Sequence, residues 1–104
     1  MIRGKKWKNV MYLIQYSDNG IMSKQIIKEE KMEVTLFSMS EGTNISEHTS
    51  TKQGAVYVIE GDGIFNLEGE EIKMVPGVII NMNKNAVHLI KADENTTFLL
   101  ILNK

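Results

Sequence analysis

Two histidines are the residues of this chain best suited to chemistry, and no cysteine accompanies them. A neutral imidazole can bind a transition metal, share hydrogen bonds with a ligand, or transfer a proton near neutral pH. His48 and His88 lie forty residues apart, so their spacing alone does not say whether they meet. That depends on the elements that carry them.

The chain is divided by turn-forming residues that recur at short intervals, such as Asn19-Gly20 and Pro76-Gly77. Short, evenly spaced, β-rich runs between such turns predict an all-β sandwich or closed barrel, because a parallel α/β sheet would need helix-length patterns between its strands. The predicted strands are residues 22–28, 32–39, 45–50, 55–60, 64–67, 71–74, 78–82, 86–91 and 97–102.

The segment before the first predicted strand has a different period. Trp7, Val10, Met11 and Ile14 fall at helical spacing and would form one apolar stripe. Such a stripe more often packs on a core than binds a partner. We therefore expect residues 1–20 to carry a short helix that packs on a barrel made of residues 21–104.

Two of the predicted strands, at residues 55–59 and 98–102, are apolar on both alternating faces. A strand with one face in water would alternate between apolar and polar residues, so both faces of these strands need a cover. In a chain of 104 residues few elements are left to supply it. We therefore expect a homodimer.

The segments around the two histidines resemble the two motifs of cupins. Residues 42–61 fit the first motif, in which a glycine, a His-x-His pair, a glutamate and a second glycine follow at fixed spacing, with His48 as the first histidine. Residues 77–88 fit the second motif, which ends in a histidine, here His88. The resemblance covers about residues 23–102 and implies an all-β double-stranded β-helix, the jelly-roll barrel of cupins, with both histidines at its cavity.

Several motif positions depart from the family pattern. Metal-holding cupins resemble one another in using three histidines and one glutamate, but Ser50 replaces the second histidine here and Gly54 replaces the glutamate. Glu47 adjoins His48, yet neighbours in an extended strand point to opposite faces. In the second motif Asn85 replaces a glycine, and asparagine tolerates the left-handed backbone region.

Three functions are compatible with this pattern. The first is binding of a small molecule in the cavity. The second is a metal-dependent enzyme of the oxygenase or isomerase type, with His48 and His88 as ligands of Fe, Ni, Cu, Mn or Zn. The third is a metal-free isomerase or lyase in which one histidine is the base. A purely structural role for two hydrogen-bonded imidazoles is the alternative to all three.

The residues expected to contact a ligand are polar groups near the motifs and soft apolar groups on neighbouring strands. They are His48, Ser50, Gln53, His88, Met39 and Met82, with Phe37, Phe65 and Ile90 nearby.

Charge and hydropathy bear on partners and compartment. Twelve Lys and Arg residues oppose thirteen Asp and Glu residues, so the formal charge is −1 and the chain lacks the basic excess typical of nucleic-acid binding. No apolar run is long enough for a signal peptide core or a membrane span. We expect a cytoplasmic protein with no nucleic-acid or membrane partner, and the absence of cysteine suits a reducing compartment.

Overall fold

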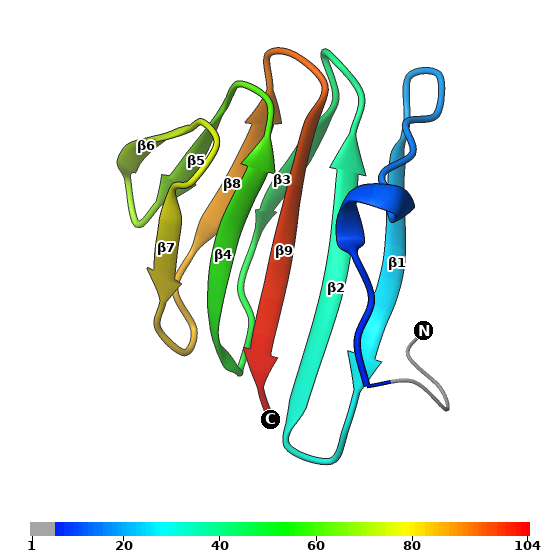
Figure 1. The fold of residues 1–104 in the computed structure, drawn as a ribbon. Coiled ribbons are helices and arrows are strands. Elements are labelled where there is room, and N and C mark those ends of the chain that lie inside the picture. Colours follow the sequence, from blue (N-terminus) through cyan, green and yellow to red (C-terminus); the bar gives the residue numbers. More distant parts are fainter. Residues whose placement is uncertain (1–5) are drawn as a thin grey trace.

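The computed structural model describes residues 6–104, and these form two antiparallel β-sheets that face each other (Figure 1). Every predicted strand is present, with bounds that differ from the prediction by two residues or fewer. The strands are β1 (Ile21–Lys28), β2 (Met32–Met39), β3 (Asn44–His48), β4 (Gln53–Glu60), β5 (Gly63–Leu67), β6 (Glu70–Met74), β7 (Ile79–Met82), β8 (His88–Ala92) and β9 (Thr96–Asn103).

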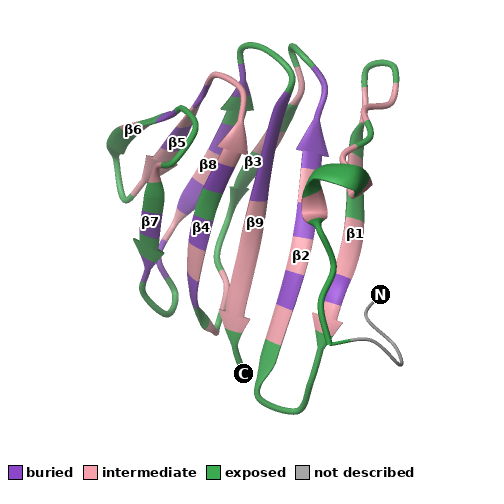
Figure 2. Ribbon diagram, viewed as in Figure 1, coloured by how far each residue is buried: buried purple, intermediate pink, exposed green. Residues whose placement is uncertain are grey.

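The two sheets enclose one apolar core, which makes the domain the expected jelly-roll barrel. The five-stranded sheet has the order β1-β2-β9-β4-β7, and the four-stranded sheet has the order β3-β8-β5-β6. Buried and more exposed residues alternate along β4 and β2, as Figure 2 shows, because successive side chains of a strand point to opposite faces. Residues buried between the sheets include Val56, Phe65 and Phe98.

The N-terminal segment contains a single 3₁₀ turn, η1 (Val10–Leu13), where a short helix was expected. Two members of the predicted stripe, Trp7 and Met11, do not pack on the barrel: their side chains are 75% and 52% exposed. In a 3₁₀ turn residues three apart share a face, so Val10 and Leu13 contact the sheet while Met11 turns away. Trp7 precedes the turn. Among residues 6–104 no helix is long and apolar enough to cross a membrane.

The two doubly apolar strands are β4 and β9, which lie at the centre of the five-stranded sheet. Their inner faces meet the core between the sheets. On the outer face, Ile59, Leu99 and Ile101 belong to a second apolar cluster that Val10, Leu13 and Ile14 cover. The N-terminal segment therefore supplies part of the cover that these strands need.

Tyr16 joins the N-terminal segment to the five-stranded sheet through hydrogen bonds of its hydroxyl group. Its hydroxyl donates to the Glu60 carboxylate at 2.7 Å and lies 2.6 Å from the hydroxyl of Thr97, which is fully buried. Burial raises the pKa of Tyr16 to about 12, so the phenol keeps its proton and remains a donor at neutral pH. These contacts join residues far apart in the sequence.

Replacing Tyr16 with phenylalanine should lower the free energy of unfolding by about 1–2 kcal/mol, because Glu60 and Thr97 lose a hydrogen-bond partner in a partly buried place. Tyr12→Phe is the matched control, since the side chain of Tyr12 is exposed. Urea unfolding of the three proteins measures the difference. Equal stability of the wild type and Tyr16→Phe would mean that the phenol does not hold the segment in place.

Candidate functional site

His48 and His88 lie directly opposite each other on the adjacent antiparallel strands β3 and β8. Their ring centroids are 4.2 Å apart and the ring planes are inclined by 60°. The fold brings together two positions that are forty residues apart in the sequence, and the two imidazoles form one cross-strand pair. The structure thus brings together the two residues that the sequence singled out.

An irregularity in β3 lets His48 face inward. Ile45 pairs with Ile90 and His48 pairs with His88. Between these two pairs β3 has two residues and β8 has one. Regular alternation from the inward-facing Ile45 would turn His48 to the outside, but a β-bulge adds one residue and restores the inward direction. Ile45 and His48 consequently both line the same cavity.

The cavity between the sheets is an apolar chamber of about 240 Å³. Phe65 stacks on the His88 ring at a centroid distance of 5.6 Å, and Phe37 stacks on Phe98 at 5.3 Å. Both sheets contribute to the wall, so the chamber lies within the core itself. The lining residues are Phe37, Ile45, His48, Val56, Phe65, Met82, His88, Ile90, Phe98 and Leu100.

A polar mouth of about 390 Å³ adjoins the chamber and shares both histidines with it. The loop between β3 and β4 supplies its polar side, residues 49–52. The Ser50 carbonyl accepts a hydrogen bond from the Asn85 amide at 2.7 Å, and this joins the loop after β3 to the loop before β8. Asn85 has a φ of 64°, the left-handed conformation for which asparagine is suited.

The backbone fixes the orientation of both imidazoles. Nδ1 of His88 lies 3.2 Å from the Ala86 carbonyl, and Nδ1 of His48 lies at a longer 3.4 Å from the Ser46 carbonyl. A carbonyl only accepts, so the contact at His88 favours the tautomer with its proton on Nδ1, in which Nε2 is the acceptor. His88 is 5% exposed, and this burial, helped by the neighbouring His48, lowers its pKa below 6.5. His88 is therefore a neutral imidazole near pH 7.

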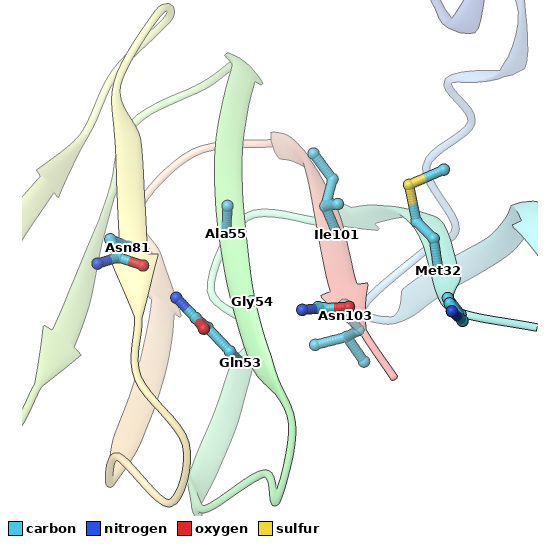
Figure 3. Close-up of a pocket in the computed structure, with 9 residues that line it drawn as sticks. Met32, Gln53, Gly54, Ala55, Asn81, Ile101 and Asn103 are labelled. Carbon is cyan, nitrogen blue, oxygen red and sulfur yellow. The ribbon is translucent and has the colours of Figure 1, made fainter.

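Of the other predicted contact residues, Ser50 and Met82 line the same cavities as the histidines. Gln53 and Met39 do not. Met82 lines both chamber and mouth, and Ser50 lines the mouth. Gln53 lies on the outer face of the five-stranded sheet beside Asn81, in a separate groove (Figure 3). Met39 is buried in the core but lines neither cavity, because it lies at the far end of β2 opposite Thr96.

Sequence reasoning missed several further residues that line the site, among them Phe98, Leu100 and Lys52. Phe98 and Leu100 belong to a strand whose apolar residues predicted only packing, and Lys52 lies in the loop after His48 with no motif position. The alternation that places Val56 and Val58 inside was the available signal, since it also excludes Gln53 from the cavity.

The donor set does not fit the metal centre that the cupin resemblance implies. Such a centre needs three or more protein ligands, whereas residues 6–104 contain no group of three histidine or acidic residues placed to hold a metal. Position 54 cannot supply the missing carboxylate, because a Cβ on Gly54 would lie 2.8 Å from Leu102 Cδ2 and 2.9 Å from the Ile101 carbonyl oxygen.

Fold comparison places this barrel in a known class, that of double-sheeted jelly-roll domains. No protein-family model matches the chain, and no curated protein matches it. A conserved protein of unknown function from Streptococcus pyogenes superimposes with a TM-score of 0.87 at 21% identity, over 99% of this chain and 90% of that one.

Two further structures carry the family name. A cupin 2 conserved barrel domain protein from Leptotrichia buccalis has a TM-score of 0.86 at 26% identity, over 93% of this chain and 47% of that one. A cupin superfamily protein from Desulfitobacterium hafniense has a TM-score of 0.83 at 20% identity, over 88% of this chain and 84% of that one. The chain has the jelly-roll fold of these cupin proteins, which is the fold that the two motifs predict, and this likeness shows the fold alone.

The low pKa of His88 should make stability depend on pH. Its pKa in the folded protein lies below 6.5, so the unfolded chain binds this proton more readily. The stability linked to the neutral ring is present above about pH 6.5 and is lost as the pH falls through the pKa of the folded protein. Imidazole NMR titration should give a midpoint below 6.5 for His88.

Urea unfolding gives an independent measure of the same effect. From neutral to mildly acidic pH, His88→Gln should lose less stability than the wild type, whereas His48→Gln, which keeps the buried ring, should resemble the wild type. An ordinary midpoint with equal pH dependence in all three proteins would show that burial does not disfavour the charged form of His88.

Proposed function

We propose that this barrel binds a small, largely apolar molecule in the chamber between its sheets, with His48, His88 and Ser50 as its polar contacts. The observation that carries this proposal is the chamber of about 240 Å³ in the centre of the core, which has aromatic and aliphatic walls and one polar end. Binding sites in proteins have this composition: mostly apolar walls with a few polar groups that fix orientation.

The location of the chamber favours a ligand-binding site over a packing defect as the explanation of this cavity. Val56, Phe65, Phe98 and other core residues form its wall, so the space costs van der Waals contacts in the best-packed part of a small domain. Cavities in protein cores destabilise in proportion to their volume, and a bound molecule would restore the contacts.

The geometry favours binding over catalysis. Each imidazole is oriented by a backbone carbonyl, and no carboxylate lines the chamber or the mouth to orient a histidine base or stabilise its charged form. Ser50 has no base arranged to activate it: its hydroxyl accepts the Lys52 amide at 3.1 Å.

Filling the chamber tests this function. Val56 faces the chamber and its neighbour Tyr57 faces outward, so Val56→Phe should abolish binding of a ring-sized probe such as toluene, while Tyr57→Phe should leave it unchanged. The readout is the NMR shift of the Met82 methyl group, which lines the chamber. Ile45→Phe provides a second filling variant if Val56→Phe does not fold. A probe that shifts Met82 equally in the wild type and the filled variants would contradict the proposal.

The homodimer expected from the sequence forms, in our proposal, through the outer face of the five-stranded sheet. On this face Tyr57 pairs with Ile79, and the two residues are 41% and 70% exposed. Exposed aromatic residues and scarce charge are the composition of interface cores. The N-terminal segment packs on the part of this face around Ile26, Val34 and Leu36, whereas Tyr57 and Ile79 stay exposed.

A second copy suits this face because the face can pair with itself. Its groove of about 350 Å³ has Ala55 and Ile101 in its lining, with the carboxamides of Gln53, Asn81 and Asn103 around them (Figure 3). Carboxamides both donate and accept, so two identical surfaces related by a two-fold axis can satisfy each other without opposite charges. Lys31 is the one charged residue among those that line the groove.

Light scattering at micromolar concentration tests the assembly. The wild type should be a dimer, and Ile79→Arg should be a folded monomer, because Ile79 is exposed in the single chain and arginine there would place two like charges near the axis. Glu71→Arg, an exposed charge change on the other sheet, should stay dimeric. A monomeric wild type would remove the proposal.

A further inference from the structure

We infer that the ligand of this chamber is a small apolar carboxylate, whose ring or branched tail fills the chamber and whose anionic head lies in the mouth beside Lys52. This inference rests on the proposed binding function and adds the chemical class of the ligand. The distribution of charge around the two cavities carries it.

Lys52 is the only charged side chain among the residues that line the chamber and the mouth, and neither lining contains an aspartate or glutamate. A cationic ligand would leave water for a site with no counter-charge and with a positive neighbour, which is unfavourable. A neutral ligand could accept a hydrogen bond from the lysine but would gain no attraction between opposite charges. An anion is the one class of head group that the charge of the site attracts.

Lys52 has no close ion-pair partner among the described residues. The nearest carboxylate is that of Glu33, whose Oε1 lies 4.0 Å from Lys52 Nζ and 2.6 Å from Lys104 Nζ. Lys104 is therefore the close partner of Glu33, and the three side chains together keep one positive charge. The side chain of Lys52 is partly exposed, which leaves its long stem free to turn into the mouth.

Hydroxyl donors surround the same place. The Ser50 hydroxyl oxygen accepts the Lys52 amide at 3.1 Å, so its own proton is available to a ligand. Thr49 and Thr51 line the mouth with two more hydroxyls. An ionised carboxylate only accepts hydrogen bonds, at two oxygens, and so complements a site of hydroxyl protons and one ammonium group. A phosphate dianion would need more than one cation to offset its desolvation.

The size of the chamber limits the tail. A volume of about 240 Å³ is below the range of about 300–1,000 Å³ typical of pockets for drug-sized molecules, and the walls carry the stacked pair Phe37 and Phe98. These dimensions and surfaces fit one aromatic ring or a short branched chain joined to the head group.

Three probes that share a phenylethyl-sized frame and differ in charge test the inference: phenylacetate, 2-phenylethanol and 2-phenylethylamine. At about pH 8 the first is an anion and the last a cation. Titrations followed by the Met82 methyl shift should show phenylacetate binding about fivefold more tightly than the alcohol, and the amine most weakly. Added salt should weaken binding of phenylacetate and leave the alcohol unchanged.

Lysine variants assign the effect to its source. Lys52→Gln should remove the preference for phenylacetate over the alcohol, and Lys52→Arg should keep it. Lys84→Gln is the matched control, since Lys84 lies in the adjacent β7–β8 loop and lines neither cavity. An alcohol or amine that binds as tightly as phenylacetate, or a preference that survives Lys52→Gln, would overturn the inference and leave the binding function standing. Failure of all three probes to shift Met82 would overturn both.

Discussion

The pairing of β3 with β8 is the constraint on which the site depends. The hydrogen-bonded register sets His48 opposite His88, and the extra residue in β3 turns His48 toward the interior. The loop that follows β3 then starts at the rim of the cavity, and the contact between Ser50 and Asn85 holds it against the loop before β8. One strand pair therefore positions both the imidazoles and the polar mouth beside them.

The same residues build the core and the wall of the chamber. Phe65, Met82 and Phe98 are buried in the main apolar cluster and also face the open space. In a larger domain different residues could pack the core and line the cavity, but a chain of this size has one main core. The domain compensates on its outer surface, where the N-terminal segment buries a second apolar cluster and Tyr16 fastens the end of that segment.

The sequence predicted the strands well because its turn residues mark almost every boundary, and it predicted the histidine pair because both lie on registered motif positions. Two features depended on information that local sequence does not carry. The bulge in β3 is a property of strand pairing, and the outward direction of Trp7 follows from a 3₁₀ turn in place of a longer helix. Gln53 was assigned to the cavity by its closeness to the motif, although alternation from Val56 places it outside.

Gly54 also limits how this barrel can diverge. A Cβ at that position would lie 2.8 Å from Leu102 Cδ2 and 2.9 Å from the Ile101 carbonyl oxygen, so a carboxylate could appear there only if the Leu102 side chain moved and the backbone of β9 shifted. The gain of a fourth ligand in this barrel therefore requires coordinated changes in β4 and β9, and a substitution at Ser50 alone would not supply it.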